Sequence, residues 1–180
     1  MKTVLWWAVA ALAAACTATG VRSREVVAAF PAGWSGTWRG TLEVCNADGA
    51  LPGASVEHVI EPTEDPARWR WVTTYDGAAG RVVKDYTLLV RDALRGAYAI
   101  DERDGVVLEA RWLGDALHTW FEVGGSLLIV RESVLANGTA AATYCFELLT
   151  APTATAADGD GAVRCFAPVV LQRARLRRVR

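Results

Sequence analysis

Two histidines are the side chains of this chain best suited to acid–base or metal chemistry. His58 lies in the segment VEHVI and His118 in LHTW, and an imidazole can act as a general base or ligate a metal or haem. Metal sites combine several ligands, and the sequence places no ligand cluster beside either histidine. We therefore interpret both as surface or hydrogen-bonded strand residues. His118 alternates with Leu117 and Thr119, which points it outward.

An acidic cluster, DERDG at residues 101–105, is the second candidate for chemistry. Two of its carboxylates could act as an acid–base pair, and its oxygens could ligate calcium. However, Asp101, Glu102 and Asp104 lie before a glycine between two expected strands, which is typical of a solvated hairpin turn. The sequence contains no G-x-S-x-G elbow and no phosphate-binding loop. We therefore expect neither an enzyme nor a cofactor or bound metal.

The composition limits the class of protein. The chain has 180 residues, enough for one domain with a substantial core, and its formal net charge of -1 argues against nucleic-acid binding. Hydrophobic residues make up 52% of the chain and include eight Trp but one Met. Because rigid aromatic and branched side chains favour β-structure, these numbers indicate a β-rich domain.

The first residues predict export. Residues 1–16 contain an early lysine, an apolar run and then small residues, and the run is shorter than the ~20 residues that span a bilayer. This pattern is typical of a secretory signal peptide, followed here by a lead-in segment, 17–33. The stretch LAAAC is also similar to the lipobox of bacterial lipoproteins, in which Cys16 would be lipidated. We expect a secreted, extracellular or periplasmic protein, with membrane anchoring through Cys16 as an open alternative.

Three further cysteines, Cys45, Cys145 and Cys165, would lie in an oxidising compartment, where a disulfide is expected. The count is odd, so one thiol is left over. We expect the pair Cys145–Cys165, because these residues lie on strands that are neighbours in the chain. Cys45 remains an alternative partner, since barrel closure would bring the end of the first strand near the start of the last.

Strand and turn signals alternate from residue 34 onward, without a long helical period. We expect strands near 34–45, 54–61, 67–75, 81–91, 96–101, 106–113, 116–123, 126–134, 139–149 and 163–178. Within 67–75, Trp69, Trp71 and Tyr75 share one face while Arg68 and Arg70 share the other. Such alternation is typical of antiparallel strands that cover a core on one side only.

The expected fold class is therefore all-β: a single domain, 34–180, in which an antiparallel up-and-down meander closes into a barrel of about 8–10 strands. Closure is favoured because it removes exposed sheet edges. A β-sandwich is the alternative, but it needs longer crossing connections than this chain offers outside residues 150–162.

The segment SGTWRG adds a family resemblance. Gly36, Thr37 and Trp38 resemble the G-x-W signature on the first strand of lipocalins and the wider calycin superfamily. The resemblance implies that Trp38 closes one end of the barrel beneath an arginine of the last strand. The C-terminal candidates are Arg173, Arg175, Arg177 and Arg178, of which we choose Arg175. It also implies binding of small apolar molecules, but no particular ligand, because the helices found in parts of the superfamily have no counterpart here.

Inward-facing aromatic residues are the candidate ligand-binding residues. Most must form core, but a barrel of this size can enclose a cavity for one small ligand. The expected ligand-binding set is Trp69, Trp71, Tyr75, Lys84, Tyr86, Trp112 and Phe121. An ammonium inside such a barrel needs an anionic partner, so either the ligand carries an acidic group that Lys84 meets, or this strand turns its other face inward.

We therefore predict an exported calycin-like barrel that binds a small, largely apolar or amphipathic ligand. The alternative is a non-enzymatic envelope or surface interaction module with a filled barrel. Such a module would contact its partner through an outward-facing Trp120 or through the loop 150–162.

Overall fold

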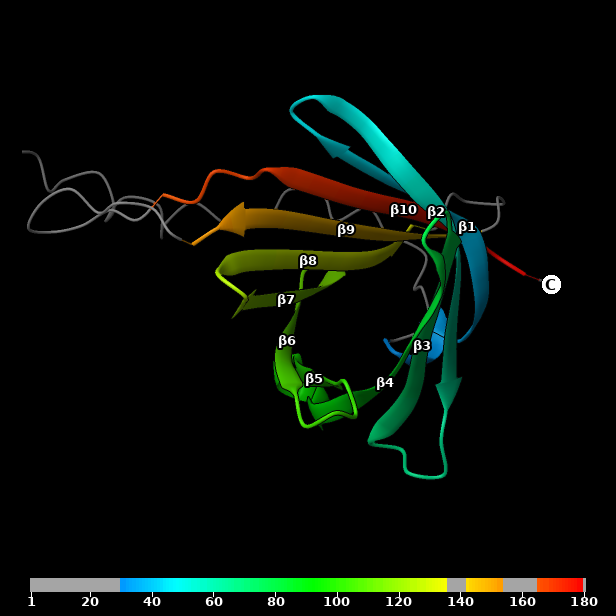
Figure 1. Ribbon diagram of the computed structural model, residues 1–180. Helices are drawn as coiled ribbons and strands as arrows, with labels where there is room; N and C mark the ends of the chain where they lie inside the picture. Colours follow the sequence, from blue (N-terminus) through cyan, green and yellow to red (C-terminus); the bar gives the residue numbers. More distant parts are fainter. Residues whose placement is uncertain (1–29, 136–141, 154–164, 180) are drawn as a thin grey trace, which may run out of the picture.

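Ten antiparallel strands form one closed barrel in the computed structural model, which describes residues 30–135, 142–153 and 165–179 (Figure 1). The strands are β1 (Gly36–Asn46), β2 (Gly49–Pro62), β3 (Arg68–Gly77), β4 (Gly80–Asp92), β5 (Ala97–Asp101), β6 (Val107–Leu113), β7 (Ala116–Val123), β8 (Ser126–Leu135), β9 (Thr143–Pro152) and β10 (Val170–Arg178). Two short 3-10 helices, η1 (Ala32–Trp34) and η2 (Ala93–Arg95), accompany them. The expected meander and its closure are confirmed.

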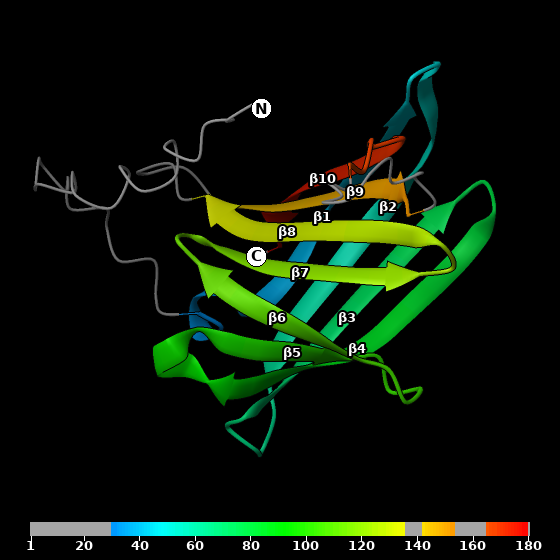
Figure 2. The same ribbon diagram turned by 90° about the vertical axis from the view of Figure 1, so that its left-hand side faces the viewer.

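Each strand pairs with its neighbours in the chain, and β1 pairs with β10 to close the barrel. Figure 2 shows the strands from β3 to β8 crossing the wall at a tilt, as barrel closure requires. Gly40 is needed at the closing seam, because a Cβ atom there would clash with the carbonyl oxygen of Arg175 on β10.

The predicted strands agree with the observed ones except near the first hairpin and at the start of the last strand, where β10 begins at Val170 and not near residue 163. The expected strands 34–45 and 54–61 leave the segment NADGALPG, residues 46–53, as the connecting turn. In the structure the turn consists of Ala47 and Asp48 alone, and β2 already begins at Gly49. Gly49 has φ +126, a backbone conformation that side chains disfavour, so the tight turn can form. The resulting long β1–β2 hairpin projects from the barrel (Figure 1).

The expected disulfide is not formed: Cys45, Cys145 and Cys165 are all free. The strand register explains why the preferred pair was wrong. Cys145 on β9 lies opposite Arg175 of β10, ten residues further along the chain than Cys165. Cys165 precedes β10 and continues away from that position, so the two thiols are separated along the β9–β10 pair rather than opposed.

Trp38 closes one end of the barrel, as the G-x-W resemblance implies. Its side chain is fully buried, and its indole Nε1 donates a hydrogen bond to the carbonyl oxygen of Trp34, at 2.9 Å. The arginine above it is Arg178, not Arg175: the guanidinium carbon of Arg178 lies 4.5 Å from the ring centroid. Both arginines are exposed, but Arg178 is the register partner of Trp38, whereas Arg175 lies opposite Thr41.

Replacing Arg178 tests this assignment. Arg178→Ala removes the cation–π contact and the hydrogen bond from Nη2 to the carbonyl oxygen of Gly33, at 2.7 Å. We expect the free energy of unfolding in urea to fall by about 1–2 kcal/mol. Arg175→Ala, the matched control on the outer face, should change it by less than about 0.5 kcal/mol. Equal effects of the two variants would contradict the assignment.

The expected signal peptide, the lead-in to residue 29 and Cys16 lie outside the described residues, as do residues 154–162 of the loop 150–162. No helix within 30–135, 142–153 and 165–179 combines the length and apolar character needed to cross a membrane.

Candidate functional site

The barrel contains a cavity of about 740 Å³. Its outer part is lined by residues next to the β3–β4, β5–β6 and β7–β8 turns, among them Val82, Val106 and Val123, which are about half exposed. Its inner wall is formed mainly by apolar and aromatic side chains, including Leu42, Ile100, Leu128, Val130, Phe146 and Leu148. The cavity therefore opens at the end of the barrel that carries these three turns.

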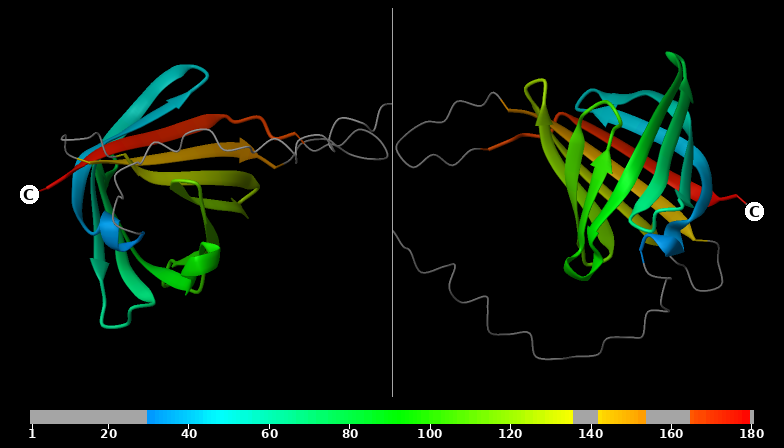
Figure 3. Two further views of the ribbon diagram at one scale, coloured as in Figure 1. Left: turned by 180° about the vertical axis from the view of Figure 1, so that it is seen from behind. Right: turned by 90° about the horizontal axis from the view of Figure 1, so that it is seen from below.

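The opposite end is closed by packed aromatic rings. Phe30 stacks on Trp112, with ring centroids 4.7 Å apart, and meets Trp34 edge-on, also at 4.7 Å. Trp34 in turn contacts Trp71 and Tyr144. These residues come from Phe30 and η1, before the first strand, and from strands on several sides of the barrel, and Figure 3 shows η1 against one end of the barrel wall. We call this the aromatic plug; it gives the cavity a floor.

The expected ligand-binding residues divide between the cavity and the plug. Trp71, Tyr75, Lys84, Tyr86 and Phe121 all line the cavity. Their role in binding remains a prediction. Of the two orientations left open for Lys84, the structure has the inward one.

Two expected residues do not line the cavity. Trp112 belongs to the aromatic plug, and Trp69 packs against the same core. Both face inward, but their positions along β6 and β3 lie beyond the floor. Period-2 alternation identifies the inward face of a strand and carries no information on depth along the barrel axis.

Charged residues surround the outer part of the cavity. Lys84 is exposed, and its Nζ lies 6.0 Å from the ring centroid of Tyr86. Glu102 and Glu122 also line the cavity. Burial and a hydrogen bond with Glu102 raise the pKa of Tyr86 above its usual range. Lys84 therefore faces inward, yet it lies near the opening, where water can solvate its charge.

Glu132 lies at the inner end of the cavity. Its side chain on β8 is only 7% exposed, and its Oε1 accepts a hydrogen bond of 2.6 Å from the hydroxyl of Tyr144. Burial raises its pKa to about 7. Tyr75 is partly buried as well, and this burial together with the nearby charge of Glu132 raises the pKa of Tyr75 to about 12. Glu132 is thus a buried carboxyl group that changes charge near neutral pH.

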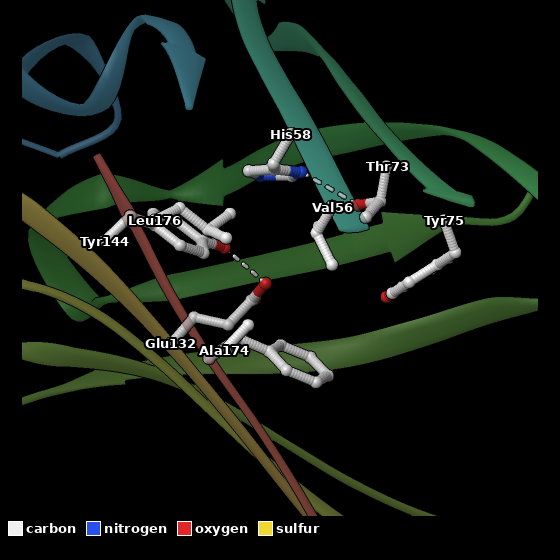
Figure 4. A pocket seen from close by; sticks show the side chains of 9 residues that line it. Val56, His58, Thr73, Tyr75, Glu132, Tyr144, Ala174 and Leu176 are labelled. Atoms are coloured by element: carbon white, nitrogen blue, oxygen red, sulfur yellow. Dashed lines mark hydrogen bonds between the residues drawn. The ribbon is translucent and has the colours of Figure 1, made fainter. Parts of the chain in front are cut away.

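His58 and Glu132 both line a second, small pocket of about 30 Å³ at the inner end of the main cavity. The Nδ1 atom of His58 is 2.8 Å from Thr73 Oγ1, while its Nε2 has no hydrogen-bond partner among the described residues. Burial lowers the pKa of His58 to about 3, so the ring is neutral. Figure 4 shows His58, Thr73, Tyr75, Glu132 and Tyr144 converging on this pocket, which we call the floor pocket.

Sequence reasoning missed the floor pocket. It assigned His58 to a structural role and did not consider Glu132, although one signal was present. Glu132 shares the inward face of its strand with Leu128, Val130 and Val134 and is the one charged residue in that series. A single carboxylate within an apolar series on an inward face is a candidate for a binding or catalytic group.

Comparisons with known proteins add little to this geometry. No family model matches the chain, and no curated protein matches its sequence. A solved structure described as "Structure of EF1p2_mFAP2b bound to DFHBI" is similar, with 14% sequence identity and a TM-score of 0.35, covering 81% of this chain and 93% of that one. A likeness this distant does not identify a ligand, so the function must be inferred from the residues of this chain. Within the described residues, no group of three or more His, Cys, Asp or Glu could hold a metal ion.

Proposed function

We propose that this protein is an exported, non-enzymatic, calycin-like barrel that binds one small, largely apolar ligand. The observation that carries the proposal is the cavity of about 740 Å³. Binding sites for small molecules typically measure about 300–1,000 Å³ and combine apolar walls with a few polar groups that orient the ligand. The G-x-W segment, with Arg178 over Trp38, supports the calycin-like assignment.

The walls and floor fit an amphipathic ligand. Tyr86, Phe121 and Phe146 give the lumen flat apolar surfaces, against which an apolar body would be removed from water. The polar groups lie at the two ends, in the floor pocket and near the opening. A ligand that fills the cavity would therefore have an apolar middle and at least one polar head.

A filled barrel that acts only through its outer face is the alternative. Trp120, which is 67% exposed on β7, favours it because a large exposed indole is typical of contact surfaces. The interior cavity has no role in that function, whereas ligand binding accounts for it directly. We therefore prefer the binding function.

Obstructing the cavity tests the proposal. Leu148 lies on the inward face of β9, opposite Val130 and Gln172 of the neighbouring strands. Leu148→Trp projects an indole into the lumen, so we expect it to weaken binding of the neutral apolar dye Nile red at least tenfold. Leu149→Trp adds the same bulk to the outer face of the same strand and should leave the affinity unchanged. Fluorescence titration measures both, and non-saturable dye uptake or equal affinities would contradict the proposal.

A further inference from the structure

The charges that line the cavity are predominantly negative. Glu102, Glu122 and Glu132 contribute carboxyl groups, whereas Lys84 is the single Lys or Arg among the described residues that line it. Lys84 lies near the opening and Glu132 at the inner end, so the one cationic side chain is not placed to neutralise the deepest carboxyl group.

Glu132 has no cationic partner within the part of the chain that the structure describes. Among the described residues its side chain receives one hydrogen bond, from the Tyr144 hydroxyl to Oε1, and takes part in no ion pair. A carboxyl group taken out of water without a cation is strongly disfavoured in its charged form. Its second oxygen is left without a hydrogen-bond donor from the described residues, at a position that borders both the cavity and the floor pocket.

His58 offers a second unsatisfied group at the same place. The residue is 2% exposed, its ring is neutral, and its Nε2 lacks a hydrogen bond. When Nδ1 carries the proton and donates it to Thr73 Oγ1, Nε2 presents a lone pair. An unsatisfied nitrogen buried in this way is disfavoured unless a ligand or water supplies its partner.

We propose that the ligand carries a protonated amine, which binds in the floor pocket between Glu132 and His58 while the apolar body of the ligand fills the cavity. This inference rests on the proposed function. An ammonium group has three N–H donors and no acceptor, which suits a carboxylate oxygen and an imidazole lone pair. The floor pocket, at about 30 Å³, has room for such a head group. Tyr75 and Tyr144 also line the pocket, and tyrosine rings can attract a cation held over their faces.

An anionic head group does not fit this end of the cavity. A ligand carboxylate in the floor pocket would face Glu132 without a compensating cation from the described residues. It would meet Lys84 only near the opening, in water, where an ion pair contributes little. From the sequence we expect the ligand to carry an acidic group that meets Lys84. The charges of the cavity favour a basic group on the ligand instead.

Three probes with the same tail and different heads test the proposal: octylammonium, 1-octanol and octanoate. In calorimetric titrations at pH 8 we expect octylammonium to bind at least tenfold more tightly than either of the others. Glu132→Gln, which keeps the shape of the side chain and removes its charge, should reduce octylammonium binding to the level of octanol. Glu109→Gln removes a carboxylate from the outer face of β6 and should change nothing.

The pH dependence of the wild-type protein gives a second measurement that needs no variant. The titratable groups that face Glu132 are Tyr75, Tyr144 and His58, and Lys84, Glu102 and Glu122 line the wider cavity. The pKa of Tyr75 is about 12, that of His58 about 3, and that of Tyr144 lies well above its usual value, so none of these changes charge near neutral pH. The advantage of octylammonium over octanol should therefore grow between pH 6 and pH 8.

Two results would overturn the proposal while leaving the proposed function intact: equal binding of the three probes, or tightest binding of octanoate that is lost in Lys84→Met. If none of the three probes binds and none displaces Nile red, the proposed function fails as well. Octylammonium binding that survives Glu132→Gln unchanged and is flat between pH 6 and pH 8 also rejects the assigned position of the amine.

Discussion

Trp38→Ala is expected to lower the free energy of unfolding by about 3–5 kcal/mol, as large truncations in a core do. The indole is fully buried, donates to the carbonyl oxygen of Trp34, and is covered by the guanidinium of Arg178. Truncation therefore leaves a cavity, removes the hydrogen bond to the Trp34 carbonyl and removes the ring that the Arg178 guanidinium covers. Equilibrium unfolding in urea, followed by circular dichroism, measures the change.

The control for this variant is Trp120→Ala. Trp120 is 67% exposed on the outer face of β7, so the same truncation leaves no cavity there and should change stability by less than about 0.5 kcal/mol. A small effect of Trp38→Ala, comparable with that of Trp120→Ala, would show that the seam between β1 and β10 is held by other contacts.

The closing seam shows how far the sequence predicts this fold. Alternation and turn chemistry were sufficient for ten strands and their order, because both are local properties. The arginine over Trp38 could also have been found from alternation. Ala174 and Leu176 are buried on the inward face of β10, and Arg178 shares their parity while Arg175 does not. The family resemblance indicated that an arginine covers Trp38, but strand parity is needed to identify that arginine as Arg178.

The floor pocket could not be predicted in the same way. His58 and Glu132 lie on β2 and β8, far apart in the chain, and Figure 4 shows both lining the floor pocket. Their proximity depends on the strand register around the whole barrel and on the depth at which the aromatic plug ends. For Lys84, alternation left two orientations open; the structure has the inward one, and its place near the opening depends on the tilt of β4.

The pH dependence of stability should have a plateau, because His58 and Glu132 act with opposite signs. The pKa of His58 is about 3 in the folded protein and 6.5 when unfolded, so its contribution is present above pH 6.5 and is lost as pH falls toward 3. The pKa of Glu132 is about 7 when folded and 4.5 when unfolded, so its contribution is present below pH 4.5 and is lost as pH rises toward 7. Between pH 4.5 and 6.5 the two slopes cancel.

Glu132→Gln isolates one of these terms. The difference in unfolding free energy between the variant and the wild type should shift in favour of the variant by about 3 kcal/mol from pH 4 to pH 8, since each unit of pKa change corresponds to about 1.4 kcal/mol. His58→Gln should instead leave the decline above pH 6.5 in place. Urea unfolding across this range measures both, and a difference that does not change with pH would mean that Glu132 is already solvated or paired in the folded protein.

The same experiment with a ligand joins stability to binding. A bound ammonium favours the charged form of Glu132 and so lowers its pKa, which removes the reason for the decline in stability above pH 6.5. Saturating octylammonium should therefore stabilise the wild type more at pH 8 than at pH 5, whereas octanol should stabilise it equally at both. A charged Glu132 without a cation destabilises the folded protein. A cationic ligand pairs with this carboxylate, and the relief of that destabilisation adds to the affinity of the ligand. Equal stabilisation by octylammonium at both pH values would show that its amine does not reach Glu132.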